Sequence, residues 1–195
     1  MLKLRRGEVP AARISPQLGP EQVQLQRYGR RMFSQDFSYP DGKTADFWLF
    51  GANTRPVFIF PVTKANEVIV TWQYRHAINA WILELPGGNP KAGQTHEDVV
   101  RVELVEETGY WPRYIHIFWD RRVFVDPASL RMEGLVAVAQ ECELVQEPKP
   151  DGTELILPVL YDLADWVAMC DDGLISDAKS VQATRWAVNF LEKGV

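Results

Sequence analysis

The chain has 195 residues, of which 46% are hydrophobic and 24% charged, so it is long enough to bury a substantial globular core. Its formal net charge of −5 argues against a nucleic-acid partner, because a phosphate backbone requires a basic surface. The charge does not exclude a small phosphorylated ligand, which needs only a local cation.

The sequence indicates a cytoplasmic protein without a membrane partner. It has no apolar run of membrane-spanning length, and no apolar stretch follows its basic N-terminal residues as in a secretory signal. The cysteines, Cys142 and Cys170, lie far apart and lack a CxxC spacing, which favours reduced thiols over a disulfide.

Three segments are expected along the chain. Residues 1–35 are predicted to form an extended or partly loose N-terminal arm. Residues 36–55 contain a Pro-Asp-Gly turn, Pro40–Gly42, between two aromatic runs, which predicts a β-hairpin. Residues 56–195 are expected to form the main domain.

The main domain is predicted to be α+β, with an α/β/α sandwich built on a mixed sheet. Thr95 and Asp98 have the spacing of a capping box, and Gly109 stands where a helix-ending glycine belongs, so a central helix is expected between them. Pro127–Met132 is expected to be a loop. Strands are predicted within 55–63, 67–75, 80–88, 114–126, 133–145 and 154–163, and two later helices within 162–173 and 177–192.

The central helix ends in an acidic turn. Glu103, Glu106 and Glu107 share one helix face, where like charges and the negative end of the helix dipole both disfavour them. A bound hard divalent cation such as Mg²⁺ or Mn²⁺ would make this cluster of negative charges favourable, since such an ion prefers clustered carboxylate oxygens. A solvated acidic face is the alternative reading of this pattern alone.

In its context the acidic turn resembles the Nudix hydrolase box, G-x5-E-x7-R-E-U-x-E-E-x-G-U. Two positions depart from the box: Gln94 replaces a Glu, and Val102 replaces an Arg, with Arg101 one residue earlier. The resemblance implies the Nudix fold, a mixed sheet between helices, with a small N-terminal antiparallel β element. The matching residues are Gly88, Glu103, Leu104, Glu106, Glu107 and Gly109, and Tyr110 fills the last apolar position loosely.

The resemblance extends to the ADP-ribose pyrophosphatase branch of this family, from the Q-Y-R strand end to the Pro-Gly-Gly loop. It implies that Arg75 contacts phosphate and that Gly88 lines the phosphate pocket. Trp72, Tyr74 and Trp81 are candidates for stacking on a base, with an ordinary core role as the alternative.

The same resemblance implies a metal site and a reaction. Glu103 and Glu107 are expected to bind the ion directly, Glu106 directly or through water, and Gly87 through its backbone carbonyl. Water would attack one phosphorus of a nucleoside diphosphate linked to another moiety. The general base is expected in the loop before the last strand, at Glu154 or Asp151, with Glu147 a third candidate.

The expected substrate is ADP-ribose, cleaved to AMP and ribose 5-phosphate. Two alternatives stay open: a hydrolase of another nucleotide sugar or non-standard nucleotide, and a Nudix-fold module that binds a nucleotide without cleaving it. A homodimer is expected from the resemblance, with the aromatic hairpin as the contact.

Overall fold

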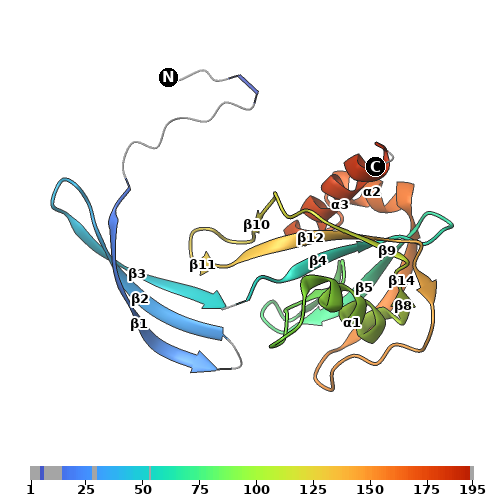
Figure 1. Ribbon diagram of the computed structural model, residues 1–195, viewed down its shortest axis with the longest axis horizontal. Coiled ribbons are helices and arrows are strands. Elements are labelled where there is room, and N and C mark those ends of the chain that lie inside the picture. The colour runs from blue at the N-terminus through green and yellow to red at the C-terminus, as the bar shows by residue number, and fades with distance from the viewer. Residues whose placement is uncertain (1–4, 7–14, 28–29, 53, 194–195) are drawn as a thin grey trace. The chain divides into compact units, whose positions relative to one another are not determined.

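The computed structural model describes residues 5–6, 15–27, 30–52 and 54–193, which divide into two compact units. The first unit contains the described residues before 53 together with Asp126–Arg131. The second contains the described residues of 54–125 and 132–193. Figure 1 labels most of the helices and strands of both.

The first unit is a four-stranded sheet in the order β1-β2-β3-β11. The predicted hairpin is confirmed: β2 and β3 pair antiparallel around a turn in which Gly42 has a φ of 84°. The strand β1 forms within residues 1–35, which the sequence predicts to be an extended or loose arm. The prediction that 127–132 are only a loop is wrong at β11, which pairs parallel with the end of β3. The strands are β1 (Gln17–Arg27), β2 (Arg30–Ser38), β3 (Thr44–Ala52) and β11 (Leu130–Arg131).

The second unit contains a mixed sheet, as the sequence predicts. The fully buried strand β4 pairs parallel with β12 and antiparallel with β7, while β12 also pairs antiparallel with β9 and β10. The bounds are β4 (Val57–Pro61), β7 (Gly87–Gly88), β9 (Tyr114–Ile117), β10 (Val123–Phe124) and β12 (Glu133–Gln140).

Two smaller sheets complete this unit. One has the order β14-β5-β6, with antiparallel neighbours, and the other pairs β8 with β13. The bounds are β5 (Glu67–Arg75), β6 (Ala80–Glu84), β8 (Tyr110–Trp111), β13 (Glu143–Leu144) and β14 (Ile156–Asp162).

The alternation of side chains along β4 creates two cores. Val57 and Ile59 pack with the buried face of helix α1 (His96–Thr108), whereas Phe58 and Phe60 pack with α2 (Leu163–Asp171) and α3 (Ala178–Leu191). Figure 1 shows α1 on one side of β4 and β12 and the pair α2–α3 on the other. The predicted α/β/α sandwich is therefore confirmed.

Local signals fix the ends of the helices. Thr95 and Asp98 form both hydrogen bonds of the predicted capping box, and Gly109 ends α1 in the left-handed conformation, with a φ of 81°. Asp177 caps α3 by accepting a hydrogen bond from Ser180 N. In the part of the chain that the structure describes, no helix is long and apolar enough to cross a membrane.

Candidate active site

The glycine strand β7 lies directly against the acidic end of α1. Gly87 N–H donates a hydrogen bond of 3.2 Å to Glu107 Oε2, and a Cβ on Gly88 would lie 2.2 Å from Glu103 Oε1. On the other side, a Cβ on Gly87 would lie 2.4 Å from the carbonyl oxygen of Val57. Only glycine fits at position 87, because the backbone of β4 leaves no room for a side chain there, whereas a side chain at position 88 would displace the carboxylate of Glu103.

The carboxylates of this turn are held in an environment that disfavours their charge. Burial, with the charge of Glu106, raises the pKa of Glu103 to about 7, and Lys91 offsets only part of this shift. Burial and the charge of Glu103 also raise the pKa of Glu107, which is only 5% exposed, well above its usual value. The hydrogen bond from Gly87 and the charge of Arg75 offset only part of this rise.

The loop before β14 brings further carboxylates to the same place. The charge of Glu154 raises the pKa of both Glu103 and Glu107, whereas that of Asp151 acts on Glu103. The loop is attached to the end of α1, since Lys149 N donates to the Glu106 carbonyl at 2.8 Å. Glu154 N donates to the Asp151 carbonyl at 2.8 Å, which closes a turn between the two acids. Glu154 and Asp151, two of the three candidates for the general base, therefore lie within electrostatic range of the box glutamates.

Arg75 approaches this site from the end of β5. It shares one face of the β5–β6 pair with Glu84, and its guanidinium donates two hydrogen bonds to that carboxylate, at 2.5 Å from Nε and 2.7 Å from Nη2. Burial alone would lower the pKa of Arg75, but Glu84, Glu107 and Asp177 together raise it. Arg75 is therefore a fixed cation beside Glu107.

Gln94, which replaces a box glutamate, and Arg101, which precedes Val102, both have partners away from the box glutamates. Gln94 Oε1 accepts a hydrogen bond of 2.8 Å from Lys91 N and so shapes the loop before α1. Arg101 lies 3.4 Å from Glu97 and places its guanidinium 5.8 Å from the Trp111 ring centroid. It takes part in this surface cluster, whereas Glu107 is held by the hydrogen bond from Gly87 and stabilised by the charge of Arg75.

The aromatic candidates occupy the other face of the β5–β6 pair. Trp72 stacks on Trp81 at a centroid distance of 6.2 Å, and Tyr74 packs edge-on against Trp81. Because successive strand residues point to opposite faces, Trp72 and Tyr74 face away from the side on which Arg75 binds Glu84. The structure does not bring these rings to the glutamates, and their role in base stacking stays a prediction.

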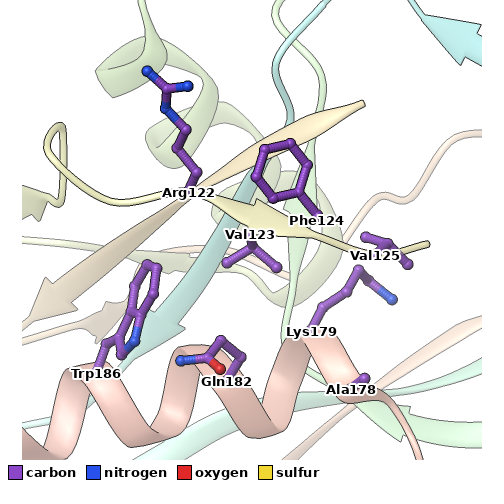
Figure 2. A pocket seen from close by; sticks show the side chains of 8 residues that line it. All are labelled: Arg122, Val123, Phe124, Val125, Ala178, Lys179, Gln182 and Trp186. Atoms are coloured by element: carbon purple, nitrogen blue, oxygen red, sulfur yellow. The ribbon is translucent and has the colours of Figure 1, made fainter. Parts of the chain in front are cut away.

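A pocket of about 220 Å³ lies between β10 and α3 (Figure 2). Lys179, Gln182 and Trp186 line it from the helix, while Arg122 and Phe124 point away from the helix. Its Lys179 also lies 3.7 Å from Glu84 Oε2, so the pocket adjoins the Arg75–Glu84 pair from the α3 side.

The donor set at the acidic turn fits a hard divalent cation. Its candidate ligands are carboxylate and backbone oxygens, and burial without full charge compensation is what a bound cation would relieve. Within the residues that the structure describes, no three His, Cys, Asp or Glu side chains are arranged closely enough to enclose an ion as they stand. The ligand set Gly87, Glu103, Glu106 and Glu107 stays a prediction.

Comparison with known proteins agrees with this architecture. The family model of the NUDIX domain matches residues 52–173. An ADP-ribose pyrophosphatase of Bacillus subtilis (strain 168) is 25% identical over 165 residues, which is 83% of this chain and 84% of that protein. A crystal structure of an ADP compounds hydrolase has a similar fold, with a TM-score of 0.77 at 19% identity, covering 92% of this chain and 95% of the other.

These matches define the class of the protein. The chain belongs to the Nudix family, and within it is a pyrophosphohydrolase that resembles ADP-ribose pyrophosphatases. The family expected from the acidic turn is thus confirmed, together with its fold.

Sequence reasoning identified Arg75 but missed its partner Glu84 and the second cation, Lys179. Glu84 was read only as part of the strand that leads into the glycine loop, and Lys179 only as part of a helix start. The available signal was a charged residue inside the apolar run 80–86, because a buried carboxylate requires a cation close by.

Proposed function

We propose that the protein is a divalent-metal-dependent hydrolase that cleaves the diphosphate of ADP-ribose to AMP and ribose 5-phosphate. The observation that carries this proposal is that Glu103 and Glu107 lie against the Gly87–Gly88 backbone, where the charge of Glu154 also acts on them. Buried carboxylates of this kind suit a site that is completed by a cation and a phosphorylated ligand.

Each group at the turn has a proposed role. Glu103 and Glu107 would hold Mg²⁺ or Mn²⁺ directly, Glu106 directly or through water, and Gly87 through its carbonyl. The bound ion would neutralise the diphosphate and lower the pKa of the attacking water. The carboxylates must be deprotonated for this, so metal binding and proton release are coupled.

The protein's own side chains would orient the substrate and move the proton. Arg75 presents a planar fork that can bond two phosphate oxygens, and the backbone of Gly88 lets the diphosphate approach closely. Glu154 is the better placed general base, because its charge acts on both Glu103 and Glu107, whereas the charge of Asp151 acts on Glu103.

ADP-ribose is the preferred substrate because the relative from Bacillus subtilis is named an ADP-ribose pyrophosphatase and matches over 83% of this chain. The adenine base is proposed to stack on an aromatic side chain, for which the exposed Trp72 and Trp81 and the half-buried Tyr74 remain the candidates. Other nucleotide sugars share the diphosphate and belong in the same test.

We also propose a homodimer formed through the N-terminal sheet, in a cytoplasmic setting. The strand β3 exposes Trp48 and Phe50, which share one face of the sheet because they are two residues apart, each by more than two fifths of its surface. An aromatic surface of this kind is typical of an interface. Cys142 and Cys170 are both free, which suits a reducing compartment.

The test is a phosphate-release screen across nucleoside diphosphate derivatives with Mg²⁺ and with Mn²⁺, in which coupled phosphatase reports the monophosphate products. ADP-ribose is expected to give the highest kcat/KM, and Glu107→Gln to abolish the metal-dependent rate. Glu97→Gln, on the exposed face of the same helix, is the matched control and should retain activity. Undiminished turnover by Glu107→Gln would overturn the assignment of the site.

A further inference from the structure

Glu84 is a buried carboxylate that the proposed reaction does not use. Its side chain is only 1% exposed, although it stands at the end of a strand next to the glycine loop. A buried charge is costly unless it is paired and hydrogen-bonded, so its surroundings should contain cations held for that purpose.

Two cations surround the Glu84 carboxylate. Arg75 donates to both of its oxygens, and Lys179 Nζ lies 3.7 Å from Oε2. Lys179 is itself paired with Asp177 at the start of α3. The four side chains carry two positive and two negative charges, so the network is neutral and does not need a ligand to balance it.

The main chain at Glu84 is fixed from two directions. Thr71 Oγ1 donates to the Glu84 carbonyl at 3.1 Å, and Leu85 N donates to Ser180 Oγ at 2.7 Å. Ser180 Oγ in turn donates to Asp177 Oδ2 at 2.7 Å. The carboxylate therefore sits on a rigid base formed by β5 and the first turn of α3.

The bond to Glu84 uses one edge of the Arg75 guanidinium. The Nε and Nη2 donors point to the carboxylate, and the Nη1 edge takes no part in this pair. The Arg75 side chain is 45% exposed, and its positive charge lowers the pKa of Glu107. A bidentate pair fixes the plane of the guanidinium as well as its position.

We propose that Glu84 is a positioning residue that locks one edge of Arg75, so that the other edge is presented to the diphosphate beside Glu107. The inference rests on the proposed function, in which Arg75 binds phosphate. It adds that Arg75 acts as an oriented fork rather than a mobile positive charge, and that the start of α3 sets this orientation through Lys179, Asp177 and Ser180.

A double-mutant cycle tests this coupling, because two residues that act as one unit give non-additive effects. The variants are Glu84→Gln, Arg75→Ala and the double substitution, measured by ADP-ribose hydrolysis at saturating Mg²⁺ and by calorimetric affinity for ADP. Glu84→Gln is expected to lower kcat/KM about 10–100-fold, because misplacing a binding group costs rates of this order. In the Arg75→Ala background the same change should cost less than about threefold.

The controls separate positioning from folding. Glu67→Gln removes a carboxylate from the far end of β5, where it accepts a bond from Thr63, and should stay within about threefold of wild type. Arg75→Lys keeps the charge but cannot form the fork, so it should resemble Arg75→Ala even if Glu84→Gln fails to fold. Wild-type activity in Arg75→Lys, or a full effect of Glu84→Gln in the Arg75→Ala background, would overturn the proposal.

The result also separates this inference from the proposed function. If the wild-type chain hydrolyses no nucleoside diphosphate derivative, the proposed function fails, and the coupling is read from the affinities for ADP alone. Non-additive ADP affinities would then support the positioning role, and additive ones would reject it. If hydrolysis is found but the effects are additive, only the role of Glu84 is rejected.

Discussion

Gly88 and Glu103 are packed so closely that a Cβ at position 88 would lie 2.2 Å from the Glu103 carboxyl carbon. The contact joins the strand that carries the phosphate-pocket glycines to the helix that carries the metal-binding candidates. It shows that the position of the Glu103 carboxylate depends on the absence of a side chain at Gly88.

The first prediction concerns Gly88→Ala. The added methyl group meets the far end of a flexible side chain, so Glu103 is expected to rotate away while the fold survives. Because Glu103 is a candidate ligand, affinity for Mn²⁺ and kcat/KM should each fall about 10–100-fold. Isothermal titration with Mn²⁺ and steady-state kinetics measure the two effects.

A matched control is Gly19→Ala in the N-terminal sheet, where the new Cβ would lie in ordinary contact with Asp36 at 3.4 Å. It should leave Mn²⁺ affinity and turnover unchanged. Wild-type affinity in Gly88→Ala would show that Glu103 does not hold the ion in the position seen here.

Much of this site was predictable because its signals are local. The spacing of Glu103, Glu106 and Glu107, the Thr95–Asp98 capping box and the left-handed Gly109 depend on neighbours within a few residues. The two-sided core of β4 likewise follows from an apolar run too short for a helix.

The parts that sequence reasoning missed depend on contacts between distant segments. Leu130–Arg131 is too short to show a strand pattern and forms β11 only by pairing with β3. Glu84 and Lys179 are 95 positions apart and meet because α3 packs against the end of β6. Neither pairing has a local sequence signal, since each is fixed by the tertiary fold.

The second prediction is that Glu107→Gln stabilises the metal-free protein. Burial and the charges of Glu103 and Glu154 oppose ionisation of the wild-type side chain as the pH rises, and the amide removes this cost because it carries no charge. The melting temperature without metal should rise by about 2–4 °C for each kcal/mol gained. Thermal unfolding measures it, and wild type alone should gain stability on adding Mn²⁺. A lower melting temperature in the variant would contradict the prediction that the Glu107 carboxylate destabilises the metal-free protein.

The third prediction concerns pH and the metal-free fold. The pKa of Glu103 is raised to about 7, so the folded state retains a proton that the unfolded chain releases near its ordinary value of 4.5. Stability should therefore be full below about pH 4.5 and fall as the pH rises through about 7. Because Glu103 is partly exposed and solvent screens its charge, the loss should be about 1–2 kcal/mol.

Urea unfolding between pH 5 and pH 8, without metal, measures this slope. Glu103→Gln should flatten it, and saturating Mn²⁺ should oppose it, because the ion binds the deprotonated carboxylates. A metal-free stability that increases across this interval, with the same increase in Glu103→Gln, would exclude Glu103 as its source.

The fourth prediction separates Glu154 from Asp151, the two candidates for the general base whose charges act on Glu103. Glu154→Gln should lower kcat about 10²–10⁴-fold, the range expected for the loss of a positioned base. Asp151→Asn should have a much smaller effect, because the charge of Asp151 acts on Glu103 whereas that of Glu154 acts on Glu107 as well. Rapid-quench measurement of the hydrolytic step, with Mn²⁺ affinity as the control, distinguishes a lost base from a lost ion.

The fifth prediction concerns the proposed dimer. Trp48 is 54% exposed on β3, and burying an indole of this size at an interface would contribute strongly to association. Trp48→Ser should shift the protein from dimer to monomer in sedimentation velocity at micromolar concentration. Phe124→Ser, at a side chain of similar exposure on β10, is the control and should leave the sedimentation coefficient unchanged. A wild-type chain that already sediments as a monomer would remove the basis for this interface, while leaving the Nudix unit and its acidic turn unaffected.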